Sequence, residues 1–75
     1  MKGSLQKLGV TVRLRRHELG LSQQELAALA GEMDRSYLSE IENGRKNVSF
    51  TAFLRLAAAL ELTLTEFIRR MDLKP

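Results

Sequence analysis

The sequence predicts an all-α fold, a compact bundle of five short helices. Apolar residues recur three and four positions apart along most of the chain, and strand-favouring residues do not alternate over any useful length. Residues that commonly cap helices precede several of these apolar stretches, and the single proline is the last residue, Pro75. The 75 residues contain no repeat and no low-complexity segment, so residues 1–75 are expected to form one domain.

The first two helices are predicted from a glycine stop and a capping box. The first should run from about Leu5 to Glu18 and end at Gly20, because glycine readily adopts the positive φ found at helix ends. The second should begin after Ser22. The Ser22 hydroxyl can accept the amide hydrogen of Glu25, and the Glu25 carboxylate can accept that of Ser22.

The remaining three helices are predicted from the same signals. Asp34 should cap the third helix, which ends at Gly44. Ser49 should cap the fourth, and Thr63 with Glu66 repeats the capping box at the start of the fifth. The residue before each of these caps is apolar, which suits the hydrophobic staple that often accompanies a helix start.

The expected hydrophobic core takes one face from each helix. Its predicted members are Leu8, Val12, Leu19, Leu21, Leu26, Leu29, Ala30, Leu38, Ile41, Phe53, Leu54, Ala57, Leu60, Leu62 and Phe67. A chain of this size buries only about 60% of its unfolded surface, so its stability is marginal unless packing is efficient or a partner helps. Dimerisation is one such help.

Composition excludes several classes of function. The chain has no cysteine and one histidine, His17, so it cannot form a disulfide or a zinc site of the usual ligand count. Nothing places a general base beside a nucleophile in a cleft. We therefore expect no enzyme, no metal or other cofactor and no small-molecule ligand.

No apolar run approaches the roughly 18 residues of a membrane span. We therefore expect a cytoplasmic protein without a membrane partner.

The predicted third helix has an unusual outer face. Leu38 and Ile41 fall on one side and should face the core, whereas Ser36, Ser39 and Asn43 fall on the other. Solvent-exposed helix faces usually carry long Lys and Glu side chains; Ser and Asn are poorer helix formers. Small polar side chains allow a helix backbone to approach another surface closely. A short glycine-containing turn precedes this helix, an order that can place a second helix against DNA.

Three stretches of the chain resemble the Cro and repressor type of helix-turn-helix, the XRE family. They are GLSQQELAALAG (20–31), DRSYLSEIENGRKNVSF (34–50) and LRLAAALELTLTEF (54–67), which together cover most of the sequence. Within the family, DRSYLS-x-IE-x-G-x-x-N in so short a chain looks most like the controller proteins of restriction-modification systems. The resemblance implies five helices, with a helix-turn-helix unit at about 22–43, and a sequence-specific transcriptional regulator that binds double-stranded DNA, with association to the nucleoid.

The resemblance also assigns residues to DNA binding. The matching positions are Gln23, Gln24, Arg35, Ser36, Tyr37, Ser39, Glu40, Asn43, Arg45, Lys46 and Asn47. Arg35 is the first candidate for sequence discrimination, because an arginine can donate two parallel hydrogen bonds to guanine O6 and N7. Arg45 and Lys46 follow Gly44 at a helix end, where they would neutralise phosphates without reading sequence. The net charge of +3 suits such an anionic partner, although weakly.

One family position implies structure instead of binding. Glu42 falls on the inner flank of the third helix, and Arg16 occupies the position whose side chain pairs with it in the family. We therefore expect an internal ion pair between them. The alternative is that the Glu42 carboxylate is exposed.

The chain departs from the family pattern at three places. The turn at Glu32–Asp34 is one residue longer than usual, Glu40 points a negative charge towards DNA, and Glu61 stands where a glycine commonly ends the fourth helix.

The C-terminal helix, about 64–72, carries more apolar residues than a single last helix can bury. They are Leu64, Ile68, Met71 and Leu73. Surplus apolar surface indicates an interface, so the sequence predicts a homodimer with Leu64, Ile68 and Met71 at its interface. Two reading helices would then face a palindromic operator about 34 Å apart. The alternative is an antitoxin or another protein-interaction module, with this helix holding a different protein.

Arg13 and Arg15 of the predicted first helix are either a second phosphate-binding cluster or part of a solvated face.

Overall fold

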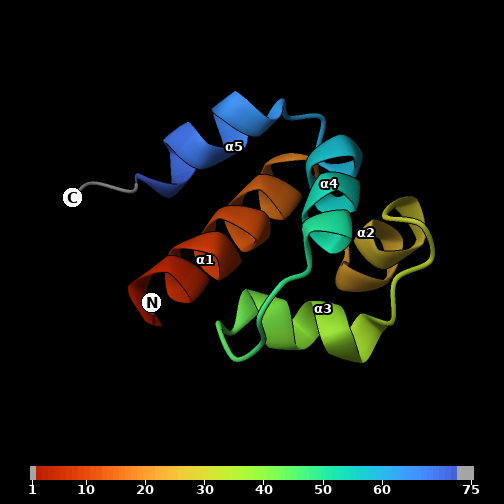
Figure 1. Cartoon of the computed structure of the whole chain (residues 1–75). Helices are drawn as coiled ribbons and strands as arrows, with labels where there is room; N and C mark the ends of the chain where they lie inside the picture. Colours follow the sequence, from red (N-terminus) through yellow and green to blue (C-terminus); the bar gives the residue numbers. More distant parts are fainter. Residues whose placement is uncertain (1, 73–75) are drawn as a thin grey trace.

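The computed structural model describes residues 2–72 and contains five helices (Figure 1). They are α1 (Lys2–Glu18), α2 (Gln23–Leu29), α3 (Arg35–Glu42), α4 (Phe50–Ala59) and α5 (Leu64–Met71). No strand occurs in this described part, so the predicted all-α class is confirmed. α1 packs between α3 and α5, while α2 contacts α3 and α4. None of the described helices is long and apolar enough to cross a membrane.

The four predicted N-caps are present. The Ser22 hydroxyl accepts the amide of Glu25 at 3.0 Å, and the Glu25 carboxylate accepts the amide of Ser22 at 2.8 Å. Thr63 and Glu66 form the same box. Asp34 accepts the amide of Ser36 at 2.7 Å, and Ser49 accepts that of Ala52 at 3.0 Å, so both also cap their helices. α1 begins at Lys2, earlier than the predicted Leu5.

The two capping boxes also change the acidity of their carboxyl groups. The hydrogen bond from the backbone amide of Ser22 lowers the pKa of Glu25, and that from Thr63 lowers the pKa of Glu66. A carboxyl group with a lowered pKa in the folded state stabilises the fold above its unfolded pKa. This contribution is present at neutral pH and is lost as the pH falls through the lowered values.

Two residues predicted for the core are exposed. Leu29 is 60% exposed and Leu54 is 40% exposed. In α4 the buried stripe is made by residues such as Ala52 and Leu56, and Leu54 lies about 200° from Leu56 around the helix axis. In α2 the buried side is that of Leu26, together with its neighbours Ala27 and Ala30. The chain therefore leaves apolar side chains on two outer surfaces.

Met71 is also placed differently from its prediction. It was expected at a dimer interface, but it is 7% exposed and belongs to the hydrophobic core. The physical reason is that α1 packs along α5 and covers the side on which Met71 and Phe67 lie. Leu73, the other apolar residue near this end, lies outside the described residues.

α4 ends without the usual glycine, at Glu61 with φ 59°. The Glu61 amide donates to the Ala58 carbonyl at 3.1 Å, and the Leu62 amide donates to the Ala57 carbonyl at 2.9 Å. These two bonds form a Schellman motif, which requires a left-handed residue at this position. Glutamate therefore closes the helix despite the strain of a side chain in that conformation.

Glu61→Gly should raise the free energy of unfolding by about 1 kcal/mol, because glycine adopts a positive φ without steric cost. Urea unfolding followed by circular dichroism measures the change. Ala58→Gly, in the exposed part of the same helix, is the matched control and should lower it by about 1 kcal/mol. Destabilisation by Glu61→Gly would contradict this account of the α4 end.

Candidate nucleic-acid interface

α3 presents the polar surface that the sequence predicted. Leu38 and Ile41 are fully buried and fix the inner side of the helix against the core. Arg35 and Ser36 are exposed near its start. Their side chains are therefore available to a partner, and α3 itself is held by packing on its inner side.

The other predicted residues of α3 are partly buried. Tyr37, Ser39 and Glu40 are each half-buried. The Tyr37 hydroxyl donates to the Asn47 carbonyl at 3.4 Å, which ties α3 to the loop that follows it. Tyr37 therefore has a structural contact in addition to its predicted role at the interface.

The loop after α3 is held by a second Schellman motif. Gly44 has φ 70°, its amide donates to the Ile41 carbonyl at 3.0 Å, and the Arg45 amide donates to the Glu40 carbonyl at 2.9 Å. A Cβ on Gly44 would also lie 3.1 Å from Cγ of Gln6. Glycine is thus favoured here by conformation, and any side chain would also crowd Gln6. The motif places Arg45, Lys46 and Asn47 in an exposed group next to the end of α3.

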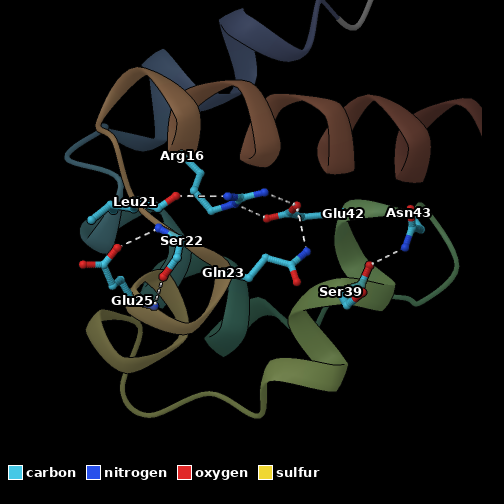
Figure 2. Close-up of polar contacts among 8 residues, drawn as sticks. All are labelled: Arg16, Leu21, Ser22, Gln23, Glu25, Ser39, Glu42 and Asn43. Carbon is cyan, nitrogen blue, oxygen red and sulfur yellow. Dashed lines mark hydrogen bonds and ion pairs between the residues drawn. The ribbon is translucent and has the colours of Figure 1, made fainter.

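Asn43 is partly occupied within its own helix. Its side-chain amide nitrogen donates to the Ser39 carbonyl at 2.9 Å, as Figure 2 shows. This bond caps the last turn of α3 and leaves the rest of the exposed amide free to contact a partner.

A buried ion pair joins α1 to α3, as predicted (Figure 2). Arg16 donates from Nε to one Glu42 oxygen at 2.8 Å and from a terminal nitrogen to the other at 3.0 Å. Glu42 is only 4% exposed. The hydrogen bond to Glu42 raises the pKa of Arg16 above its ordinary value, so the guanidinium stays charged. The alternative of an exposed Glu42 carboxylate is wrong.

Gln23 contacts this ion pair. Its side-chain nitrogen donates to the Glu42 carboxylate at 3.1 Å. The family resemblance implies a role in DNA binding for Gln23, and the structure adds a hydrogen bond to Glu42 that was not predicted. Gln24, next to it, is exposed.

Gly9 allows α1 to pack closely against the end of α3, a role that was not predicted from the sequence. A Cβ at this position would lie 2.5 Å from the Ile41 carbonyl oxygen and 2.6 Å from that of Glu42. α1 can therefore approach the end of α3 only because residue 9 has no side chain. The available signal was a glycine inside a helical pattern, which costs about 1 kcal/mol relative to alanine and often has a packing reason.

The longer turn between α2 and α3 contains two consecutive residues with positive φ. They are Gly31 at 77° and Glu32 at 56°. The Glu32 amide donates to the Ala28 carbonyl at 3.2 Å, and the Met33 amide to the Ala27 carbonyl at 2.8 Å. The extra residue is thus accommodated in a hydrogen-bonded turn that leads directly into the Asp34 cap.

Arg15 has neither of the roles considered for it. Its Nε donates to the Leu60 carbonyl at 2.9 Å at the end of α4, and a terminal nitrogen donates to Glu18 at 3.0 Å. Glu18 also pairs with Arg70 of α5 at 3.0 Å. Arg15 therefore links the end of α1 to the end of α4, and its guanidinium is occupied by these hydrogen bonds and not available to a phosphate.

The outer side of α5 exposes an apolar pair. Leu64 is 39% exposed and Ile68 is 43% exposed, and they line a shallow hollow with Thr65, Arg69 and Asp72. In residues 2–72, no three His, Cys, Asp or Glu side chains are grouped so that they could hold a metal ion. This apolar pair is thus a candidate contact surface in addition to the polar surface of α3 and the exposed cations Arg45 and Lys46.

The chain is similar to helix-turn-helix proteins, among them controller proteins of restriction-modification systems. A family model described as helix-turn-helix, HTH_3, matches residues 12–67. Control protein C.MunI from a Mycoplasma species is 43% identical over 60 residues, 80% of each protein. The crystal structure of the restriction-modification controller protein C.AhdI from Aeromonas hydrophila has a TM-score of 0.79 and 44% identity, and the match covers 84% of this chain and 94% of that one.

A further solved structure contains DNA. It is the restriction-modification controller protein C.Esp1396I, a tetramer in complex with its natural 35 base-pair operator. It has a TM-score of 0.84 and 26% identity, and the match covers 92% of this chain and 90% of that one. The fold predicted from the resemblance is therefore the fold of solved controller proteins.

Proposed function

The chain belongs to the XRE-type helix-turn-helix family of DNA-binding transcription regulators, and from this membership we propose that it is the controller of a restriction-modification operon. It would bind a palindromic double-stranded operator as a homodimer. From this function we infer that it acts in the cytoplasm, in association with the nucleoid.

The observation that carries the proposal is that α3 carries two different groups of exposed side chains, one at its start and one just after its end. The exposed Arg35 and Ser36 can reach the edges of bases, whereas Arg45 and Lys46 form a separate group of exposed cations. Reading sequence and neutralising phosphate are distinct tasks, and the chain supplies different residues for each. The named relatives are controller proteins, and C.Esp1396I is seen on its operator.

The homodimer is supported by the apolar pair on α5. Leu64 and Ile68 are four residues apart, so they share one side of the helix. Phe50 and Leu54 expose a similar pair on α4, which packs against α5 through Phe53 and Phe67, whose ring centroids are 4.8 Å apart. A two-fold interface on α5 would shield apolar surface and present two copies of α3 to the same DNA.

Arg35→Ala and Arg45→Ala should have different effects on DNA binding. Arg35→Ala should remove about 1–3 kcal/mol of discrimination between the correct base pair and a wrong one. Arg45→Ala should weaken binding to all duplexes alike and reduce the slope of log K against log salt by about 0.9. Gel-shift titrations on matched and substituted duplexes at several salt concentrations measure both. Unchanged binding by both variants would contradict the assignment of this surface.

A further inference from the structure

Glu42 is the last residue of α3, and its carboxylate accepts hydrogen bonds from side chains of α1 and α2. It accepts two hydrogen bonds from Arg16 and one from Gln23, the first residue of α2. A terminal nitrogen of Arg16 also donates to the Leu21 carbonyl at 3.0 Å, just before the α2 cap. The ion pair thus holds the start of α2 at a backbone atom and at a side chain (Figure 2).

The bond to Glu42 fixes which way the Gln23 amide faces. A carboxylate can only accept hydrogen bonds, so Gln23 must turn its nitrogen towards Glu42. In Figure 2 the Gln23 oxygen points away from Glu42. A glutamine side chain otherwise samples many rotamers, and ordering it at the moment of binding costs conformational entropy. In this structure the amide is held before any partner arrives.

We propose that Glu42 is a positioning residue for DNA binding, which acts by holding the Gln23 amide in the orientation that meets DNA. The inference rests on the proposed function, because it assumes that Gln23 lies at the DNA surface. It gives Glu42 a second role beside its ion pair with Arg16. The two roles are separable because the ion pair supports the fold, whereas the orientation of Gln23 matters only when DNA is bound.

A double-mutant cycle on duplex DNA separates these roles. Arg16→Met combined with Glu42→Leu replaces the buried pair by apolar residues of similar volume, a change that often preserves or raises stability. In the otherwise unchanged chain, Gln23→Ala should lower affinity about tenfold. In the apolar background it should change affinity by less than about twofold, because Gln23 has already lost its orientation. Equal losses in both backgrounds would overturn the inference.

Arg35→Ala serves as the control in both backgrounds. Arg35 makes no contact with the ion pair, so its effect on discrimination should be the same with and without the paired replacement. A different effect would show that α3 itself has moved, which would also overturn the inference because Gln23 would not be the cause.

Gln23→Met gives a second measurement that leaves the ion pair untouched. It keeps the length of the side chain and removes its hydrogen bond to Glu42, so it should lower affinity about tenfold at temperatures where the variant remains folded. Affinity equal to that of the unchanged chain would overturn the inference. Absence of any salt-dependent DNA binding by the unchanged chain would instead overturn the proposed function, and the inference with it.

Discussion

Glu42→Ala should lower the free energy of unfolding by about 3–5 kcal/mol, because it leaves the buried Arg16 guanidinium without its counter-charge. Arg16 is 9% exposed, and its guanidinium would retain only its bond to the Leu21 carbonyl. A domain of this length has a total stability of roughly 4–11 kcal/mol, so the change should bring the protein close to its unfolding midpoint.

Urea unfolding followed by circular dichroism measures this loss. The combined replacement Arg16→Met and Glu42→Leu is the matched control, since it removes both charges together and should leave the fold intact. If the Glu42→Ala variant unfolds at the same urea concentration as the unchanged chain, the ion pair does not support the fold.

Ile68→Glu should convert the proposed dimer to a monomer and lower operator affinity by about 10²–10⁴-fold. A charge on the exposed side of α5 cannot be buried at a two-fold interface, where the same charge would meet it from the partner. Loss of the dimer removes the second half-site contact and with it the gain from bivalent binding. Sedimentation and gel-shift titration measure the two effects.

Leu29→Glu is the control for this experiment. Leu29 is also an exposed apolar residue, but it lies on α2, away from α5. If the proposed dimer forms through α5, this variant should sediment as the unchanged chain does. Dissociation by Leu29→Glu and none by Ile68→Glu would place the interface on α2.

Local signals in the sequence were sufficient for the starts of α2 to α5 but not for the ion pair. Ser22, Asp34, Ser49 and Thr63 cap their helices through contacts with residues two or three positions away, so a short stretch of sequence contains all the atoms involved. The Arg16 and Glu42 pair is distant in sequence and followed only from the family resemblance.

Contacts between helices could not be predicted in the same way. α4 has apolar side chains on both sides, so its periodicity did not distinguish Leu54 from Leu56, and only packing against the other helices decides which is buried. The requirement at Gly9 depends on backbone atoms of α3. The bond between Gln23 and Glu42 depends on how α2 crosses α3, which the sequence does not specify locally.

The most direct test of the proposed function is selection of binding sites by the unchanged chain from a pool of random DNA duplexes. We expect enrichment of an inverted repeat whose half-sites are about one helical turn, roughly 34 Å, apart, with an affinity that falls steeply as salt is raised. Recovery of duplexes without any shared sequence, or no recovery of DNA at low salt, would contradict a sequence-specific dimeric regulator.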